Sequence, residues 1–187
     1  MESGKPVTFS LADALRGYRF RYPRESELVD RFELLLREGN FAFRRDRGAG
    51  HLTASAWVLA PSREAVLLIY HRKLERWLQP GGHADGEEDL LAVARREVLE
   101  ETGLSPIPVE SAEILDLDIH RIPARGAVRE HDHFDVRFLM VAFDGEEPRG
   151  NHETRDARWI ALDEIESFNG EESVLRMREK GSLRGSA

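Results

Sequence analysis

Three glutamates gather near the end of one segment of the chain, at a spacing that would let them share a cation. The segment, residues 77–104, reads WLQPGGHADGEEDLLAVARREVLEETGL. Its second half has the period of an amphipathic helix ended by Gly103, and Glu97, Glu100 and Glu101 fall within roughly one third of its circumference. Carboxylates at a helix C-terminus are disfavoured by up to about 1 kcal/mol each, and they repel one another at this spacing. A bound Mg²⁺ or Mn²⁺, which prefers oxygen ligands, would remove that cost.

The isolated helix leaves a second interpretation open, in which the glutamates form a solvated face and pair with Arg95 and Arg96. The loop before the helix favours the interpretation in which the glutamates bind a cation. Its glycines allow the backbone and a ligand to approach one another closely. The loop residues concerned are Pro80, Gly81, Gly82 and Gly86.

The boundaries and the packing face of this helix can also be predicted. We expect it to begin near Glu88, with Asp85 as its N-cap and Glu88 as the capping-box partner. The face opposite the glutamates is apolar and suited to packing on a sheet. We expect that face to consist of Leu91, Ala92, Val98 and Leu99.

Strand-like runs lie on both sides of the helix. Strands are expected at 52–60, 65–71, 111–122 and 133–143, with a strand that runs into a helix at 157–165 and a final helix at 173–180. This order predicts an α/β fold with a mixed sheet packed in a sandwich between helices.

The chain divides into an extension, a domain and a tail. Residues 1–50 predict a helical extension, residues 51–180 one globular domain, and residues 181–187 a frayed tail. In the extension we expect a helix with Ser26 as N-cap and Gly39 as its stop. Its apolar stripe needs a hydrophobic partner, either in the same chain or in a homodimer. The stripe consists of Leu28, Phe32, Leu35 and Leu36.

Composition excludes several classes of protein. The 187 residues include no cysteine, which excludes disulfides, zinc–thiolate sites and thiol nucleophiles. The net charge of −8 argues against nucleic-acid binding through a general basic field, although bound divalent cations can reverse the sign of a local site. No apolar run approaches the roughly 20 residues that span a bilayer, and the N-terminus lacks the pattern of a secretory signal. We therefore expect a cytoplasmic protein without a membrane partner.

The stretch from Gly82 to Leu104 resembles the Nudix box of the Nudix hydrolases. The family pattern is Gly, five residues, Glu, seven residues, then Arg-Glu-aliphatic-any-Glu-Glu-any-Gly-aliphatic. Every specified position matches, and the matching residues are Gly82, Glu88, Arg96, Glu97, Val98, Glu100, Glu101, Gly103 and Leu104. The resemblance implies the Nudix fold from about residue 51 to 168. It also implies metal-dependent hydrolysis of a nucleoside diphosphate linked to another group, X.

The resemblance assigns roles to residues of the box. It implies Mg²⁺ or Mn²⁺ ligation by Glu97, Glu100 and Glu101, with the Gly81 carbonyl as a further ligand. Glu97 is expected to be the catalytic base, with Glu100 also in the catalytic set. The positions expected to shape and brace the loop and helix are Gly82, Glu88, Arg96 and Gly103.

A further acidic residue lies outside the box. Glu153 stands shortly before Arg158 and Trp159, as does the downstream acidic residue that binds metal or orients water in some family members. The resemblance therefore implies a catalytic role for Glu153. An exposed loop glutamate is the alternative.

Several residues before the helix are candidates for substrate contacts. His71, Arg72 and Lys73 could meet phosphates, and Trp77 could stack on a base, although a packing role is the alternative for Trp77. His83, in the glycine-rich loop, could contact substrate or be an exposed loop histidine.

Another candidate is the alternating run from His131 to Asp135. On a strand, His131, His133 and Asp135 would share one face, while Phe134 and Val136 would face a core. The polar face would line the active-site cleft, with His133 and Asp135 near the substrate. A separate metal site and a plain surface are the alternatives.

The leading interpretation is a Nudix pyrophosphohydrolase that acts on a small nucleotide derivative. A Nudix-fold module that senses a nucleotide without cleaving it is the alternative from another class, but such modules commonly lose box carboxylates, and this chain retains all of them. Action on capped RNA is disfavoured by the acidic balance, despite a basic patch at Arg44, Arg45 and Arg47.

Family markers do not identify the substrate. No tyrosine follows Tyr70, although dinucleoside polyphosphate hydrolases often carry one downstream of the box. Pro123 comes too late to match the proline of ADP-ribose enzymes. The isomerase branch of the fold needs a cysteine, which is absent.

Overall fold

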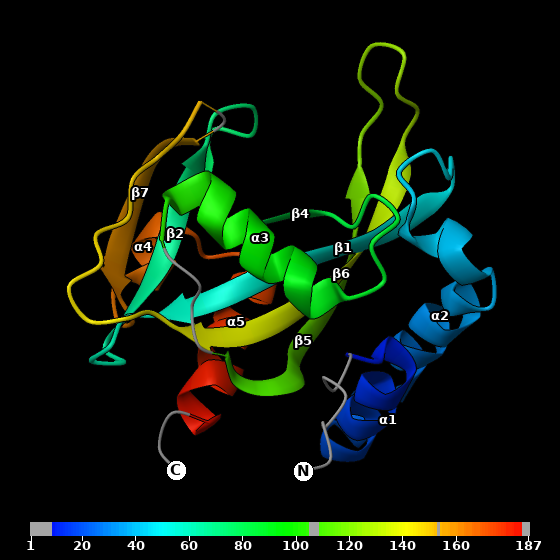
Figure 1. Cartoon of the computed structure of the whole chain (residues 1–187), viewed down its shortest axis with the longest axis horizontal. Helices are drawn as coiled ribbons and strands as arrows, with labels where there is room; N and C mark the ends of the chain where they lie inside the picture. Colours follow the sequence, from blue (N-terminus) through cyan, green and yellow to red (C-terminus); the bar gives the residue numbers. More distant parts are fainter. Residues whose placement is uncertain (1–8, 105–108, 153, 185–187) are drawn as a thin grey trace, which may run out of the picture.

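The computed structural model describes residues 9–104, 109–152 and 154–184. At its centre is a seven-stranded sheet with the order β3-β2-β1-β6-β5, in which β4 pairs with β1 and β7 with β2 (Figure 1). β1 and β6 run parallel, whereas the other paired strands are antiparallel. The strands are β1 (Gly50–Leu59), β2 (Ala65–His71), β3 (Arg76–Leu78), β4 (Gly81–His83), β5 (Val109–Ile122), β6 (His131–Val141) and β7 (Thr154–Ala161).

Helices cover both faces of the sheet, which confirms the predicted α/β/α sandwich. α1 (Leu11–Arg21), α2 (Ser26–Leu36) and α3 (Leu90–Thr102) share one apolar core with the sheet, and Figure 1 shows α3 lying across it. α4 (Ile165–Phe168) and α5 (Glu172–Arg184) form a second core. β1 separates the two, because its alternate side chains point to opposite faces. Leu52 and Ala54 join the α3 core, and Trp57 joins the α5 core.

The N-terminal extension packs on the domain rather than standing apart from it. Phe32 of α2 is fully buried, and its ring meets that of Phe134 in β6 edge-on at 5.4 Å between centroids. Leu15 and Tyr18 of α1 are also fully buried. The apolar stripe of α2 therefore finds its hydrophobic partner within the same chain. Two 3₁₀ turns, Pro23–Glu25 and Gly39–Phe43, flank α2.

Two N-cap predictions were wrong. Ser26 is the first residue of α2, and its hydroxyl donates to the Pro23 carbonyl instead of accepting from the helix. α3 begins at Leu90 and is capped by Asp89, whose carboxylate accepts from the Ala92 amide at 3.0 Å. Asp85 is too far upstream, since it occupies a left-handed turn and its carboxylate pairs with Arg45.

The predicted packing face of α3 was partly wrong. Val98 is buried and Leu91 packs on the core, as expected, but Ala92 and Leu99 are exposed. The helix is rotated so that the side of Glu97 and Glu101 faces β4. The buried residues of α3 are Leu90, Val93, Ala94, Val98, Glu101 and Thr102.

The C-terminal helix is longer than predicted. α5 continues to Arg184, beyond the expected start of the tail at 181. Gly181 lies against the ring of Trp57, where an added Cβ would sit 3.1 Å from two ring atoms. Residues 185–187 lie outside the described residues. Within the described residues, no helix has the length and apolar character needed to cross a membrane.

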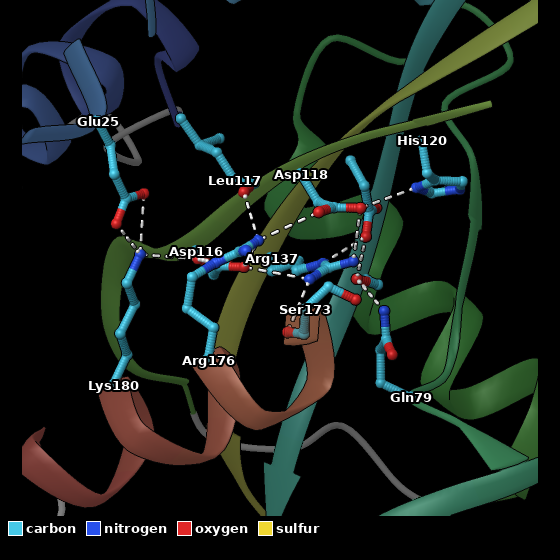
Figure 2. Close-up of polar contacts among 12 residues, drawn as sticks. Glu25, Gln79, Asp116, Leu117, Asp118, His120, Arg137, Ser173, Arg176 and Lys180 are labelled. Carbon is cyan, nitrogen blue, oxygen red and sulfur yellow. Dashed lines mark hydrogen bonds and ion pairs between the residues drawn. The ribbon is translucent and has the colours of Figure 1, made fainter. Parts of the chain in front are cut away.

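A buried charged network joins the extension, the sheet and α5 (Figure 2). Its centre is Asp116 of β5, which has no exposed surface. Asp116 accepts from Lys180 at 2.7 Å, from Arg176 at 2.9 Å and from Arg137 at 3.1 Å, and Lys180 also pairs with Glu25 at 2.7 Å. Burial acts to raise the pKa of Asp116, but these three cations outweigh it and hold the pKa below its ordinary value.

Candidate active site

A short glycine strand places the backbone directly against the glutamates of α3. Gly81 and Gly82 belong to β4, which pairs with β1, and not to an irregular loop as expected. The Gly81 amide donates to the Glu101 carboxylate at 2.9 Å. At Gly82 an added Cβ would lie 2.5 Å from the Glu97 carboxylate carbon. Only glycine at this position leaves the Glu97 carboxylate where it is.

The three box carboxylates differ in burial. Glu101 is buried and Glu97 is nearly so, with 15% of its side chain exposed, whereas 58% of the Glu100 side chain is exposed. Burial raises the pKa of Glu97, although Arg96 opposes this shift. Arg96 contacts Glu97 at 2.8 Å and Glu100 at 3.7 Å, and it also donates to the His83 carbonyl at 3.0 Å. Arg96 therefore links the helix to β4 and offsets part of the negative charge.

Donors from the segment before β7 offset more of the negative charge at the end of α3. The Asn151 side-chain amide donates to the Glu100 carbonyl at 2.6 Å, and the Arg149 amide to the Thr102 carbonyl at 2.7 Å. These carbonyls have no partner within the helix, and they form the negative end of its dipole. Glu153, predicted to be catalytic, lies outside the described residues, but Asn151 and Thr154 on either side of it contact the backbone of α3.

Two further box residues shape the ends of the site. Glu88 accepts from the Asn40 side chain at 3.2 Å, which ties the loop before α3 to the N-terminal extension. Gly103 ends α3 in the left-handed conformation with φ of 68°, where a side chain would be strained. Both residues therefore support the helix and its loop rather than facing the carboxylates.

This donor set fits a hard divalent cation. Glu97 and Glu101 offer carboxylate oxygens on a helix packed against β4, and Gly82 leaves room beside Glu97. Mg²⁺ and Mn²⁺ are the ions that such oxygen ligands suit. The structure thus brings together Gly81, Glu97 and Glu101, with Glu100 on the exposed side of the same helix.

The other predicted substrate contacts are spread over the structure. Arg72 and Lys73 are exposed in the turn between β2 and β3, and the His71 ring accepts from the Leu74 amide. Trp77 packs against Phe168 at 5.6 Å and Tyr70 at 5.5 Å between ring centroids. Trp77 therefore occupies a packing position between these two rings, as the alternative interpretation expected.

His83 and Asp135 lie on the opposite face of the sheet from Glu97. Residues alternate along β4, so His83 points away from the side on which Gly82 meets Glu97. Asp135 is buried, and its carboxylate accepts from Ser55 at 2.7 Å, from Arg137 at 2.9 Å and from Thr53 at 3.0 Å.

His133 lies among other histidines on that same face. Its ring contacts the rings of His51, His83, His120 and His131. His51 and His120 were not among the predicted functional residues. Their only signal was the polar alternation along each strand, which does not show which strands are neighbours.

Comparisons with known proteins agree with this fold. Residues 50–179 match the family model of the NUDIX domain. A MutT NUDIX hydrolase from Burkholderia pseudomallei is 25% identical, with a TM-score of 0.54, over 68% of this chain and 95% of that chain. The NUDIX domain of Shewanella oneidensis NrtR, in complex with ADP ribose, is 21% identical, with a TM-score of 0.55, over 74% of this chain and 90% of that chain. A C. elegans Ap4A hydrolase is 17% identical, with a TM-score of 0.52, over 71% and 95% of the two chains.

No curated protein matched the sequence. The sandwich, with its carboxylate helix set against a glycine strand, places the chain in the class of NUDIX-domain proteins. The chain belongs to the Nudix family, and it is a Nudix pyrophosphohydrolase.

Proposed function

We propose that the protein hydrolyses a pyrophosphate bond in a small nucleoside diphosphate derivative with the help of Mg²⁺ or Mn²⁺. The observation that carries this proposal is the contact between β4 and α3. Gly82 leaves room for the Glu97 carboxylate, and the Gly81 amide holds Glu101. Each of these two carboxylates is thus held against β4 before any ligand binds.

Each residue of the site has a distinct part in this proposal. Glu97, Glu100, Glu101 and the Gly81 carbonyl would hold the cation, which would neutralise the pyrophosphate and lower the pKa of the attacking water. Glu97 would accept a proton from the attacking water, because its carboxylate is packed against β4 and oriented by Arg96. Arg96 bridges the Glu97 carboxylate and the His83 carbonyl by donating a hydrogen bond to each. Glu153, which lies outside the described residues, would add a further carboxylate, as the resemblance implies.

A nucleotide of the type seen with the structural neighbours is the expected substrate. The neighbours include an Ap4A hydrolase and a domain in complex with ADP ribose, and both Ap4A and ADP ribose contain phosphoanhydride bonds next to an adenosine. We propose that this protein acts on the same chemical class of substrate, and that it is a cytoplasmic enzyme. A homodimer also remains a prediction.

The test uses Glu100→Gln, because Glu100 is exposed and its replacement leaves the core unchanged. Parent and variant are incubated with Mg²⁺ or Mn²⁺ and a panel of nucleotides, and the products are separated by chromatography. The panel contains NTPs, oxidised dNTPs, ADP-ribose, NADH, nucleotide sugars, dinucleoside polyphosphates and coenzyme A. We expect one class to be cleaved, and kcat to fall at least about tenfold in the variant, a loss of about 1.4 kcal/mol in transition-state stabilisation.

A matched control is Glu179→Gln, which removes an exposed glutamate from α5, far along the chain from the box. It should retain the parent rate. Metal-dependent binding of a nucleotide without cleavage would contradict the proposal and favour the sensor alternative. Equal rates for the parent and Glu100→Gln would show that Glu100 has no part in catalysis.

A further inference from the structure

Five of the seven histidines of the chain gather on the sheet face opposite the box helix. They come from four strands: His51 from β1, His83 from β4, His120 from β5, and His131 and His133 from β6. Ring centroids within this histidine cluster lie 4.9–5.4 Å apart in six pairs. The Nudix chemistry proposed above uses none of these side chains.

Strand pairing explains why residues so far apart in sequence meet here. The parallel register of β1 and β6 sets His51 opposite His133, and the antiparallel register of β5 and β6 sets His120 opposite the same residue. His131 lies two residues before His133, so its side chain points to the same face. Three adjacent strands therefore place imidazoles side by side, and β4 adds His83 at the edge.

His51 is buried without the hydrogen bonds that a buried imidazole needs. Only 1% of the residue is exposed, and neither ring nitrogen has a hydrogen-bond partner of normal geometry. A buried polar group without a partner destabilises the fold, and a bound ion would give this one a partner. One ring nitrogen of His51 lies within 4.8 Å of a ring nitrogen of both His131 and His133.

His131 is oriented as a metal-binding histidine commonly is. Its Nδ1 lies 2.9 Å from the Arg129 carbonyl oxygen, which can only accept, so Nδ1 carries the proton. In the neutral ring the lone pair is then on Nε2, which lies 3.3 Å from Nε2 of His133. Zinc at about 2.0–2.1 Å from two nitrogens in a tetrahedral site sets them about 3.3–3.4 Å apart. A backbone carbonyl that fixes the tautomer is a typical partner of a metal-bound histidine.

Burial disfavours the charged form of two of the five rings, those of His51 and His133. Burial lowers the pKa of His51 to about 4, and His83, His131 and Arg45 act in the same direction, while the backbone of Arg47 opposes them. Burial likewise lowers the pKa of His133 to about 2, and the other histidines add to this shift.

We propose that His51, His131 and His133 bind one divalent transition-metal ion of the Zn²⁺ type, separate from the cation of the Nudix box. The three nitrogens leave one position of a tetrahedral ion for water or an anionic group, as in zinc sites with three protein ligands. The ring of His83 contacts those of His51 and His133, and the ring of His120 contacts that of His133. Asp118 accepts a hydrogen bond from Nδ1 of His120 at 3.0 Å (Figure 2), which holds this ring beside His133.

Donor chemistry separates the two sites. Nitrogen ligands suit Zn²⁺, Ni²⁺ and Cu²⁺, whereas the oxygen ligands of the box suit Mg²⁺ and Mn²⁺. The sites lie on opposite faces of the sheet, since Gly82 faces Glu97 and the next residue, His83, faces the cluster. Their occupancies can therefore be measured independently.

The test uses Co²⁺ as a spectroscopic substitute for Zn²⁺ in full-length protein that carries no histidine tag. We expect the strong visible bands of a four-coordinate site to saturate at about one Co²⁺ per chain. One equivalent of Zn²⁺ should displace these bands. His131→Gln and His133→Gln should lose the bands while their far-ultraviolet circular dichroism stays that of the parent. His131 is partly exposed, so its replacement leaves the core in place.

Two control variants make the result specific. His152→Gln removes an exposed histidine outside the cluster, and Glu100→Gln alters the box; both should keep the bands. The proposal is overturned if the parent shows no four-coordinate bands, or if His131→Gln and His133→Gln retain them. It is also overturned if Glu100→Gln abolishes them, because the bound ion would then belong to the Nudix site.

Discussion

Replacement of Gly82 by alanine should remove activity while leaving the protein folded. The added Cβ would lie 2.5 Å from Cδ and Oε2 of Glu97, whereas an ordinary contact is 3.4 Å or more, so this carboxylate must move by about 0.9 Å. A misplacement of about 1 Å at a reacting group can cost on the order of 100-fold in rate. We therefore expect kcat to fall about 100-fold, which corresponds to about 2.7 kcal/mol.

The fold should tolerate this change better than the site does. The backbone at Gly82 is not left-handed, and the atoms that obstruct the new Cβ belong to a side chain that can rotate. Overpacking of this kind costs about 1–3 kcal/mol. Steady-state kinetics on the best substrate of the panel would give kcat, and urea unfolding followed by circular dichroism would give the loss of stability.

Gly103→Ala is the matched control, because it should lower stability without lowering kcat. Gly103 is left-handed with φ of 68°, and its Cβ would meet no atom within 4 Å. This variant should lose about 1–2 kcal/mol of stability and retain the parent kcat. The reasoning is refuted if Gly82→Ala keeps kcat within about threefold of the parent, a difference below 1 kcal/mol.

Three further predictions concern stability. Phe32→Ala should lower the free energy of unfolding by about 3–5 kcal/mol in urea titrations, because the ring is fully buried against Phe134. A loss below about 1 kcal/mol would mean that α2 does not pack there. Asp89→Ala should cost about 1 kcal/mol through loss of the α3 N-cap, with kcat unchanged, and an unchanged urea midpoint would argue against that cap. The cations around Asp116 lower its pKa in the folded state, so the unfolded chain takes up this proton at higher pH. The network's stabilisation should thus be complete above about pH 4, the ordinary range of Asp, and be lost as pH falls further. Unfolding curves between pH 6 and about pH 3 should converge for parent and Asp116→Asn at the acid end, and curves that stay parallel would contradict this assignment.

Sequence reasoning could predict the box and the sandwich because both depend on local periodicity. The α3 glutamates share a face at a 3.6-residue period, and the strands of the sheet alternate at a period of two. The N-cap of α3 was misplaced because Asp85 and Asp89 both precede the helix, and only the tertiary pair of Asp85 with Arg45 distinguishes them. Local pattern therefore gives the existence of an element more securely than its first residue.

The histidine cluster could not be predicted, since it depends on which strands are neighbours. His51 and His133 are far apart in sequence, and the parallel register of β1 and β6 brings them together. The run from His131 to Asp135 correctly predicted a shared polar face, but Asp135 is engaged by Thr53, Ser55 and Arg137. The H-x-H-x-D pattern therefore belongs in part to the cluster and in part to a hydrogen-bonded core.

The ladder between β1 and β6 runs over ten consecutive residue pairs without a break in register. Side chains alternate at a period of two, so insertion or deletion of one residue within either strand would turn every residue beyond it to the opposite face. His51 would then exchange places with apolar neighbours of the α3 core, and Glu97 would lose the surface against which its helix packs. We expect these two strands to tolerate substitutions but to reject changes in length, whereas loops such as the turn between β2 and β3 should accept both.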